Sequence, residues 1–253
     1  TLASLDAGQA VSANVIDAGS ADRHFVVDNG TLNLIDITLT NGSAPGTESG
    51  GSIQVINGGE ANLTNVSIVN SEADGGAAIA VNGTGGASEA TLINSTIARN
   101  STRTPDIGTL FVFSTGAQAT LTLINTTVTE NTSDVFAGVV VQTNATLDMR
   151  NSILANNDGG DCLDTGGGTT INFNTTNQIN NIVLNDGING AQPCGNTTQY
   201  LDESPQFGAI QGLPPGVIQP HYRPASNSSA LDAGDDTLVP SGITEDQIGN
   251  PRI

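Results

Sequence analysis

One phrase recurs along this chain at nearly constant spacing, and it limits the folds open to the chain. The segments ATLINSTIARN (90–100), ATLTLINTTVTEN (119–131) and ATLDMRNSILANN (145–157) place the same polar residue between two short apolar runs. A catalytic signature is needed once, whereas a packing signature recurs with every packing unit of a repeat protein. The repetition therefore indicates architecture first.

When the copies are aligned, asparagine recurs in two columns. Residues of the first column are separated by 29, 29, 31 and 26 positions. Asparagine accepts a left-handed backbone at low cost, and its amide can bond to the amide stacked above or below it. We therefore expect a turn column of Asp36, Asn65, Asn94, Asn125 and Asn151, and a closing column of Asn41, Asn70, Asn100, Asn131 and Asn157.

Each unit also contains short runs of alternating apolar residues, rich in Val, Ile and Thr, that predict β-strands. A weaker run follows a glycine, and its apolar position is expected three residues later, at Ile53, Ile79, Phe111 and Val141. No window has the stripe of an amphipathic helix, so helical repeats fit poorly, and a propeller blade needs ~40 residues or more. The prediction is an all-β fold, a right-handed parallel β-helix (solenoid) with three short strands per coil.

Two cysteines, Cys162 and Cys194, lie in a Gly- and Asn-rich stretch. A metal site would need Cys or His partners at short spacing, and neither His24 nor His221 is close in sequence. We favour a disulfide over the alternative of two free thiols. A disulfide implies an oxidising compartment, so the chain is expected to be secreted or at the cell surface.

The pattern predicts one continuous domain in three parts. Regular coils occupy 1–157, irregular disulfide-tied coils occupy 158–200, and an irregular Pro-rich C-terminal capping segment occupies 201–253. The composition changes toward the end of the chain, where eight of the ten prolines lie at or after Pro193. A cap of this kind keeps open strand edges from pairing with a neighbouring molecule.

The charge of the chain excludes some partners. It has six Arg, no Lys and a net charge of -19, so binding to nucleic acid or to an anionic membrane surface is not expected. No segment reaches the ~18 apolar residues of a membrane-spanning helix, so the chain is expected to have no membrane span.

Several stretches resemble one family of β-helices. The segment RHFVVDNGTLNLIDITLTNG (23–42), with the glycine and Asn-Ser-Thr units that follow it, resembles bacterial right-handed β-helix surface proteins with polymorphic-outer-membrane-protein-like repeats. The phrases SSALDAGDDT (228–237) and DQIGNPRI (246–253) resemble the C-terminal segment of choice-of-anchor proteins, with Ile248 where that segment usually has Arg. The resemblance covers nearly the whole chain. It implies export, surface display and a bridge between the two cysteines.

Residues for catalysis are few. Polysaccharide lyases need a base such as Lys, Arg, His or Tyr, and hydrolases need two carboxylates. Without Lys or Trp, and with two Tyr, no catalytic residue is assigned, and an enzyme is the less favoured interpretation. No cofactor is expected, although the acidic cluster Asp158, Asp161 and Asp164 could hold Ca²⁺ as an alternative to a solvated turn; its spacing is not that of an EF-hand.

A second acidic cluster, Asp232, Asp235 and Asp236, is interpreted as a structural closing turn. Two functions stay open. The favoured one is a non-catalytic surface β-helix acting as adhesin, stalk or filament component, whose partner is a surface ligand, a glycan or copies of itself. The alternative is a glycan-binding or polysaccharide-degrading β-helix (lyase or hydrolase), which Ca²⁺ could assist. The hydroxyl column of Thr38, Ser67, Thr96 and Thr127 begins the kind of ladder that ice binding uses, but Ile153 interrupts it, so ice binding is disfavoured.

Overall fold

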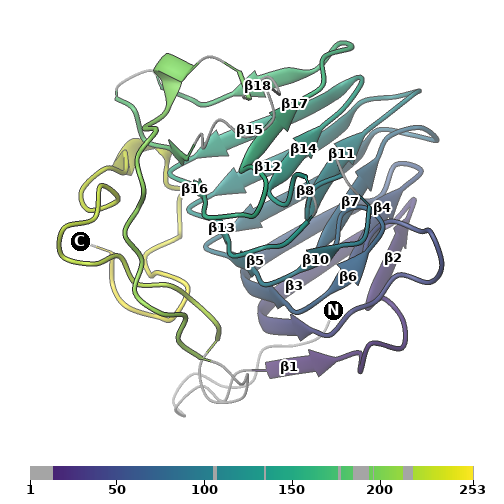
Figure 1. Cartoon of the computed structure of the whole chain (residues 1–253), viewed down its shortest axis with the longest axis horizontal. Coiled ribbons are helices and arrows are strands. Elements are labelled where there is room, and N and C mark those ends of the chain that lie inside the picture. The colour runs from purple at the N-terminus through teal and green to yellow at the C-terminus, as the bar shows by residue number, and fades with distance from the viewer. Residues whose placement is uncertain are drawn as a thin grey trace.

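The computed structural model describes residues 14–104, 107–133, 135–175, 178–184, 194–195, 197–212 and 219–252. Its strands are parallel and stack coil upon coil into a β-solenoid, which confirms the predicted fold class of a parallel β-helix (Figure 1). Short 3-10 helices occur at η2 (Thr197–Gln199) and η3 (Asp236–Leu238). Within the described ranges, no helix has the length and hydropathy that a membrane span requires.

The solenoid has three faces. Face A is a six-stranded sheet, seen at the right of Figure 1. Its strands are β2 (Phe25–Asp28), β4 (Ile53–Ile56), β7 (Ile79–Asn82), β11 (Leu110–Phe113), β14 (Val139–Val141) and β17 (Cys162–Asp164).

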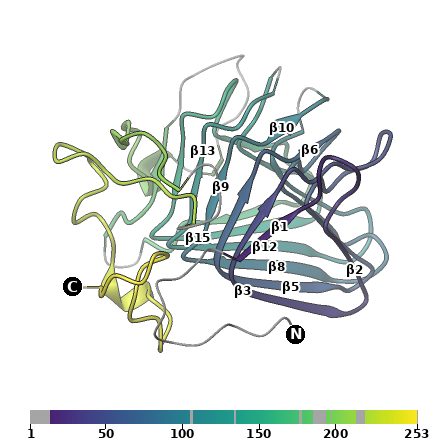
Figure 2. The same cartoon turned by 90° about the horizontal axis from the view of Figure 1, so that it is seen from below.

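Faces B and C belong to one larger sheet that bends along an edge (Figure 2). In the first coils, β3 (Thr31–Thr40) and β5 (Glu60–Val69) each run over both faces. Face B continues through β8 (Ser88–Ile93), β12 (Ala119–Ile124), β15 (Ala145–Arg150) and β18 (Thr170–Asn172). Face C contains β1 (Asn14–Asp17), β9 (Thr96–Ala98), β13 (Thr127–Thr129), β16 (Ile153–Ala155) and β19 (Ile182–Val183). A small separate sheet pairs β6 (Glu72–Ala73) with β10 (Ser101–Thr102).

The edge between faces B and C is turned by the residues of the predicted turn column. All five have a left-handed backbone, with φ between 48° and 54°. Asparagine and aspartate tolerate this conformation better than other non-glycine residues, because their short polar side chains bond locally. The bend recurs in every coil for that reason, at Asp36, Asn65, Asn94, Asn125 and Asn151.

The core lies inside the solenoid, where like residues stack in register. One inward column of face B is almost fully buried in each coil, so successive coils share one apolar core that no single coil could form. This column contains Leu34, Leu63, Leu92, Leu123 and Met149.

On face A the predicted apolar column is shifted in two coils. Ile53 and Ile79 are in register with Leu110 and Val139, so the prediction of Phe111 and Val141 for this column was wrong. The strand begins three residues after the glycine in the first two coils, but two residues and then one residue after it in the next two. The position in register with Ile53 therefore no longer lies three residues after the glycine in those two coils. Phe111 therefore faces outward and packs with Phe136, Val140 and Leu163 in a second apolar cluster outside face A.

The core is closed at its C-terminal end by aromatic residues. Phe173 and Tyr200 are 1% and 3% exposed, and their ring centroids lie 5.2 Å apart. Cys162 and Cys194 lie in the same core cluster with Cα atoms 5.4 Å apart, at disulfide distance. Strand pairing continues past residue 157, because β14 pairs with β17 and β16 with β19. The predicted part boundaries at 157 and 200 stay predictions.

Candidate functional site beneath the C-terminal tail

The described residues of 201–252, here called the tail, lie along face C (Figures 1 and 2). Their contacts with the solenoid reach residues as far as 180 positions away in sequence. Ser67 Oγ donates to the carbonyl oxygen of Pro220 at 2.8 Å, and Gln247 Nε2 donates to Ser67 Oγ at 2.7 Å. Thr96 Oγ1 donates to Gln247 Oε1 at 2.6 Å. The tail is therefore bound to the outward hydroxyl groups of face C.

These contacts bury part of the hydroxyl column that ice binding would require. Ser67 and Thr96 are 0% and 2% exposed. A hydroxyl that is buried beneath the tail cannot contact an ice lattice. On this face the hydroxyl groups of Ser67 and Thr96 hold the tail.

Replacing Gln247 with Ala is expected to loosen the tail. The change leaves the buried Thr96 hydroxyl without its acceptor, which costs about 1 to 2 kcal/mol, and hydrogen exchange of residues 243–252 should quicken. Gln211, an exposed glutamine of the same tail, offers the matched control, and Gln211→Ala should change neither quantity. Equal effects of the two substitutions would contradict the role given to Gln247.

The turn column forms hydrogen-bonded pairs and also anchors the tail. Asn65 Nδ2 donates to Asp36 Oδ1 at 2.8 Å, and Asn125 Nδ2 donates to Asn94 Oδ1 at 3.2 Å. Asn94 Nδ2 donates to the carbonyl oxygen of Glu245 at 2.9 Å. The amide groups of this edge thus serve both neighbouring coils and the tail.

Asn151 makes the second anchor of the edge. Its Nδ2 donates to the carbonyl oxygen of Asp235 at 3.0 Å, and its Oδ1 accepts from the backbone N–H of Asp235 at 2.8 Å. The Asp235 side chain in turn accepts from Thr237 N and caps η3. Of the second acidic cluster, Asp235 is buried within a turn, while Asp232 and Asp236 are exposed.

The closing column does not form one ladder. Asn41 and Asn70 have a left-handed backbone, and the residues at the same place in later coils are Arg99, Glu130 and Asn156. Arg99 Nε and Glu130 Oε2 form an ion pair at 3.0 Å there. The prediction of a single column was wrong. In the first two coils asparagine occupies the left-handed turn position, and in the later coils it occupies the next position along the chain.

The other three asparagines of the closing column, Asn100, Asn131 and Asn157, lie one position further on and form a buried ladder. Asn100 Nδ2 donates to Asn131 Oδ1 at 3.0 Å, and Asn131 Nδ2 donates to Asn157 Oδ1 at 2.8 Å. The backbone N–H of Ser71 donates to Asn100 Oδ1 at 2.9 Å. At the other end, Asn157 Nδ2 donates to Asp161 Oδ1 at 2.6 Å. The ladder satisfies backbone and side-chain groups that have no access to water.

Asp161 and Asp164 of the first acidic cluster have different hydrogen-bond partners. Asp161 is 3% exposed and ends the buried ladder. Asp164 accepts from the backbone N–H of Gly166 at 2.8 Å and from Thr169 Oγ1 at 2.7 Å. Across the described ranges, no three His, Cys, Asp or Glu side chains are grouped to hold a metal ion. A Ca²⁺ site with Asp158 stays a hypothesis.

Several arginines hold loops of neighbouring coils together. Arg103 Nε lies 2.9 Å from Asp74 Oδ1, and its Nη1 lies 3.4 Å from Glu72 Oε1. Arg23 pairs with Glu48, and Arg150 Nε lies 2.9 Å from Asp148 Oδ1. Arg103 and Arg23 therefore join loops of neighbouring coils, whereas Arg150 and Asp148 lie on the same strand, β15.

The two histidines and Tyr222 lie in packed surroundings. His24 Nε2 lies 3.0 Å from the carbonyl oxygen of Ile16, and burial lowers the pKa of His24. His221 Nδ1 lies 2.8 Å from the carbonyl oxygen of Gln219, within the tail. Burial raises the pKa of Tyr222, and the Glu130 carboxylate raises it further. None of these groups lines the cavity described next.

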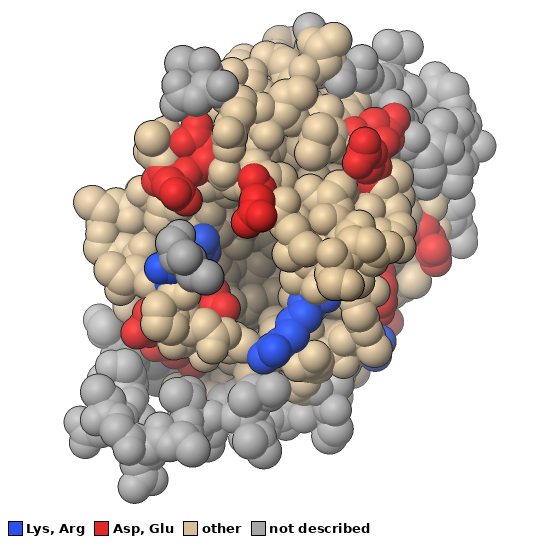
Figure 3. Space-filling model, turned by 90° about the vertical axis from the view of Figure 1, so that its left-hand side faces the viewer, with Lys and Arg blue, Asp and Glu red and all other residues tan. Residues whose placement is uncertain are grey.

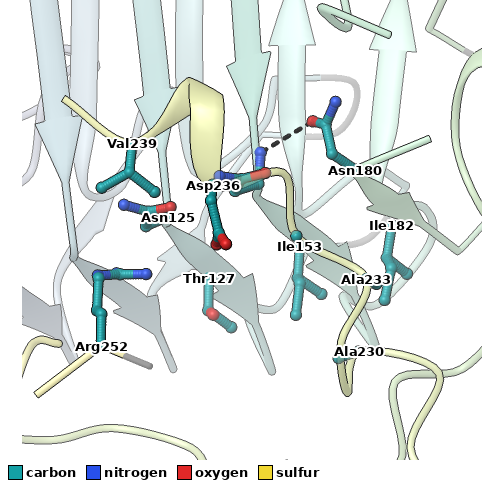
Figure 4. Close-up of a pocket in the computed structure, with 12 residues that line it drawn as sticks. Asn125, Thr127, Ile153, Asn180, Ile182, Ala230, Ala233, Asp236, Val239 and Arg252 are labelled. Atoms are coloured by element: carbon teal, nitrogen blue, oxygen red, sulfur yellow. Dashed lines mark hydrogen bonds between the residues drawn. The ribbon is translucent and has the colours of Figure 1, made fainter. Parts of the chain in front are cut away.

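A cavity of about 300 Å³ lies between face C and the tail. Thr127, Ile153 and Ile182 are in register on adjacent strands and form its floor. Asp236 and Arg252, from two separate parts of the tail, form part of its opposite wall (Figure 4). The tail side of the molecule is hollowed, and acidic and basic side chains surround the hollow (Figure 3).

The cavity is lined by groups of both charges, Asp236 and Arg252. Arg252 Nη2 donates to Asn94 Oδ1 at 2.6 Å, and no carboxylate of the described residues lies within 4.0 Å of its guanidinium. Partial burial lowers the pKa of Arg252, whereas Asp246 and Asp236 oppose this shift. Asn125 Oδ1 is buried, and no donor from the described part of the chain reaches it.

The geometry defines a parallel β-solenoid with one face covered by its own C-terminal tail and a polar cavity beneath that tail. Comparison of the chain with protein-family models, with curated proteins and with solved structures finds no match.

Proposed function

We propose that the chain is a non-catalytic β-helix of a bacterial secreted or cell-surface protein, and that it acts as an adhesin or stalk. The observation that carries this proposal is that many polar side chains bond to other parts of the chain instead of lining a catalytic site. The corner asparagines and several arginines bond to neighbouring coils or to the tail, which builds a rigid rod with a solvent-facing face B.

Face B supplies the contact surface in this proposal. Its outward positions carry polar side chains in register, such as Asn33, Asn62, Thr91 and Thr122 on successive coils. Such a surface repeats along the solenoid at the ~4.8 Å spacing between strands. A repetitive partner, such as a glycan chain, fits a repetitive surface.

Export is supported by the cysteine pair. Disulfides persist in oxidising compartments, and Cys162 and Cys194 are placed at disulfide distance in the core.

End-to-end filament growth is the less favoured version of the proposal. Phe173 and Tyr200 cover the C-terminal end of the core, so a second copy would not find an open apolar core there. A hydrolase is disfavoured as well, because glycoside hydrolysis needs two carboxylates and the described lining of the cavity contributes one, Asp236.

The test combines a binding screen with an activity screen. Purified protein is incubated with uronic-acid polymers and neutral glycans, and both retention on the polymer and release of unsaturated or reducing sugars are measured. We expect retention without product. Release of product would overturn the non-catalytic proposal, and absence of retention on every glycan tested would contradict a glycan-binding adhesin.

The contact surface is tested by matched arginine substitutions. Thr122→Arg places a bulky charge on face B, whereas Thr115→Arg places the same charge on an exposed turn. We expect Thr122→Arg to weaken retention at least about tenfold and Thr115→Arg to leave it unchanged. Equal retention of both variants would exclude face B as the contact surface.

A further inference from the structure

We propose that the cavity beneath the tail binds a small aliphatic zwitterion, such as a free α-amino acid with a branched aliphatic side chain. This inference goes beyond the surface role proposed above and does not depend on it. It rests on a cavity whose two ends differ in chemistry.

One end of the cavity carries both charged side chains. Asn125, Thr127, Asp236 and Arg252 lie toward the same side in Figure 4. The Asp236 carboxylate, which is exposed and lines the cavity, is an acceptor for an ammonium group. Arg252 uses Nη2 toward Asn94 and Nε toward the carbonyl oxygen of Glu245, so it retains N–H donors for a ligand carboxylate.

The floor at the other end of the cavity is aliphatic, and Asn180 lies on the same side in Figure 4. Across three adjacent strands the floor changes from Thr127 to Ile153 and then to Ile182, a distance of two strand spacings or ~10 Å. Ala233 from the tail lies on the same side as the two isoleucines in Figure 4. A ligand with a charged head and a short aliphatic side chain therefore matches both ends at once.

The charges favour a zwitterion over a simple anion. Two carboxylates, Asp236 and Asp246, act on Arg252, and the chain carries a net charge of -19, so an anionic ligand would be repelled. A zwitterion has no net charge and meets an acceptor and a donor together. A sugar fits less well, because the described lining has no aromatic ring on which a pyranose could stack.

The first experiment titrates the whole protein with five probes by calorimetry. They are L-leucine, 4-methylpentanoate without the ammonium, 3-methylbutylamine without the carboxylate, glycine without the side chain, and galacturonate. We expect L-leucine to bind with one site and each other probe to bind at least about tenfold more weakly. Failure of L-leucine to bind at millimolar concentration would overturn the proposal. Equal binding of 4-methylpentanoate, or preference for galacturonate, would overturn it in favour of an anion or a sugar site.

Two substitutions locate the binding. Asp236→Asn removes the charged acceptor and is expected to weaken L-leucine binding at least about tenfold. Asp232→Asn makes the same change at an exposed position of the tail outside the cavity and should leave binding unchanged. Ile153→Thr gives the floor the residue that the preceding strand already has, and should weaken L-leucine more than glycine. Unaltered L-leucine binding in Asp236→Asn would overturn the assignment to this cavity.

The binding experiments also separate this inference from the proposed function. Retention on glycans or cells is carried by face B, on the other side of the edge that Asn125 turns. Thr122→Arg should therefore leave L-leucine binding unchanged, and Asp236→Asn should leave glycan retention unchanged. Loss of both activities in either variant would contradict the separation of the two sites.

Discussion

Replacing Asn131 with Leu is expected to lower the free energy of unfolding by about 3 to 5 kcal/mol. Asn131 Oδ1 accepts from both the backbone N–H and Nδ2 of Asn100, each at 3.0 Å, and Asn131 Nδ2 donates to Asn157 Oδ1 and to the carbonyl oxygen of Ile97. Leucine removes all four hydrogen bonds and leaves the backbone N–H of Asn100 without its acceptor where water cannot reach it. Asn100 Nδ2 keeps the carbonyl oxygens of Ile68 and Ala98, and Asn157 Oδ1 keeps the backbone N–H of residue 131. Each buried unsatisfied group costs about 1 to 3 kcal/mol.

Urea denaturation of the wild type and the variant measures this loss. The matched control is Asn62→Leu, the same substitution on face B, where Asn62 Nδ2 donates to Asn33 Oδ1 at an exposed position. Because water replaces that hydrogen bond, the control should change the free energy of unfolding by less than about 0.5 kcal/mol. If Asn131→Leu were as mild as the control, the buried ladder would not be a major source of stability.

The fold could be predicted from the sequence because each coil of a solenoid carries the same short residue pattern. Each coil has a corner residue and apolar residues at the same positions. The spacing of Leu63, Leu92 and Leu123 is therefore enough to predict that they stack. Periodicity does not fix the phase of every column. Asn70 and Asn100 look equivalent in sequence, yet one turns the chain with a left-handed backbone and the other points into the buried ladder.

The cavity could not be predicted in the same way. Its floor and its wall come from parts of the chain that are far apart, and hydrogen bonds such as that between Thr96 and Gln247 join residues 151 positions apart. No periodic pattern connects Thr127 or Ile153 with Asp236 and Arg252. The interruption of the hydroxyl column by Ile153, which counted against an ice-binding ladder, was a signal of the aliphatic floor.

Removing the bridge between Cys162 and Cys194 is expected to lower stability by roughly 4 kcal/mol and to loosen the C-terminal coils selectively. The two residues are 32 positions apart, and closing a loop of that length restricts the unfolded chain by about this free energy in the chain-entropy model. In a solenoid each coil contacts only its neighbours, so a local loss is not spread evenly over the coils. β17, β18 and the aromatic cap of Phe173 and Tyr200 should therefore lose protection first.

Hydrogen exchange with and without reductant measures where protection is lost. Reductant should accelerate exchange in β17 and β18 of the wild type while β4 and β5 stay protected. The Cys162→Ala/Cys194→Ala variant supplies the control, because it should show the loosened pattern in both conditions and should not respond to reductant. Equal loss of protection in every coil would show that the bridge stabilises the solenoid as a whole, and the restriction of its effect to the C-terminal coils would then be wrong.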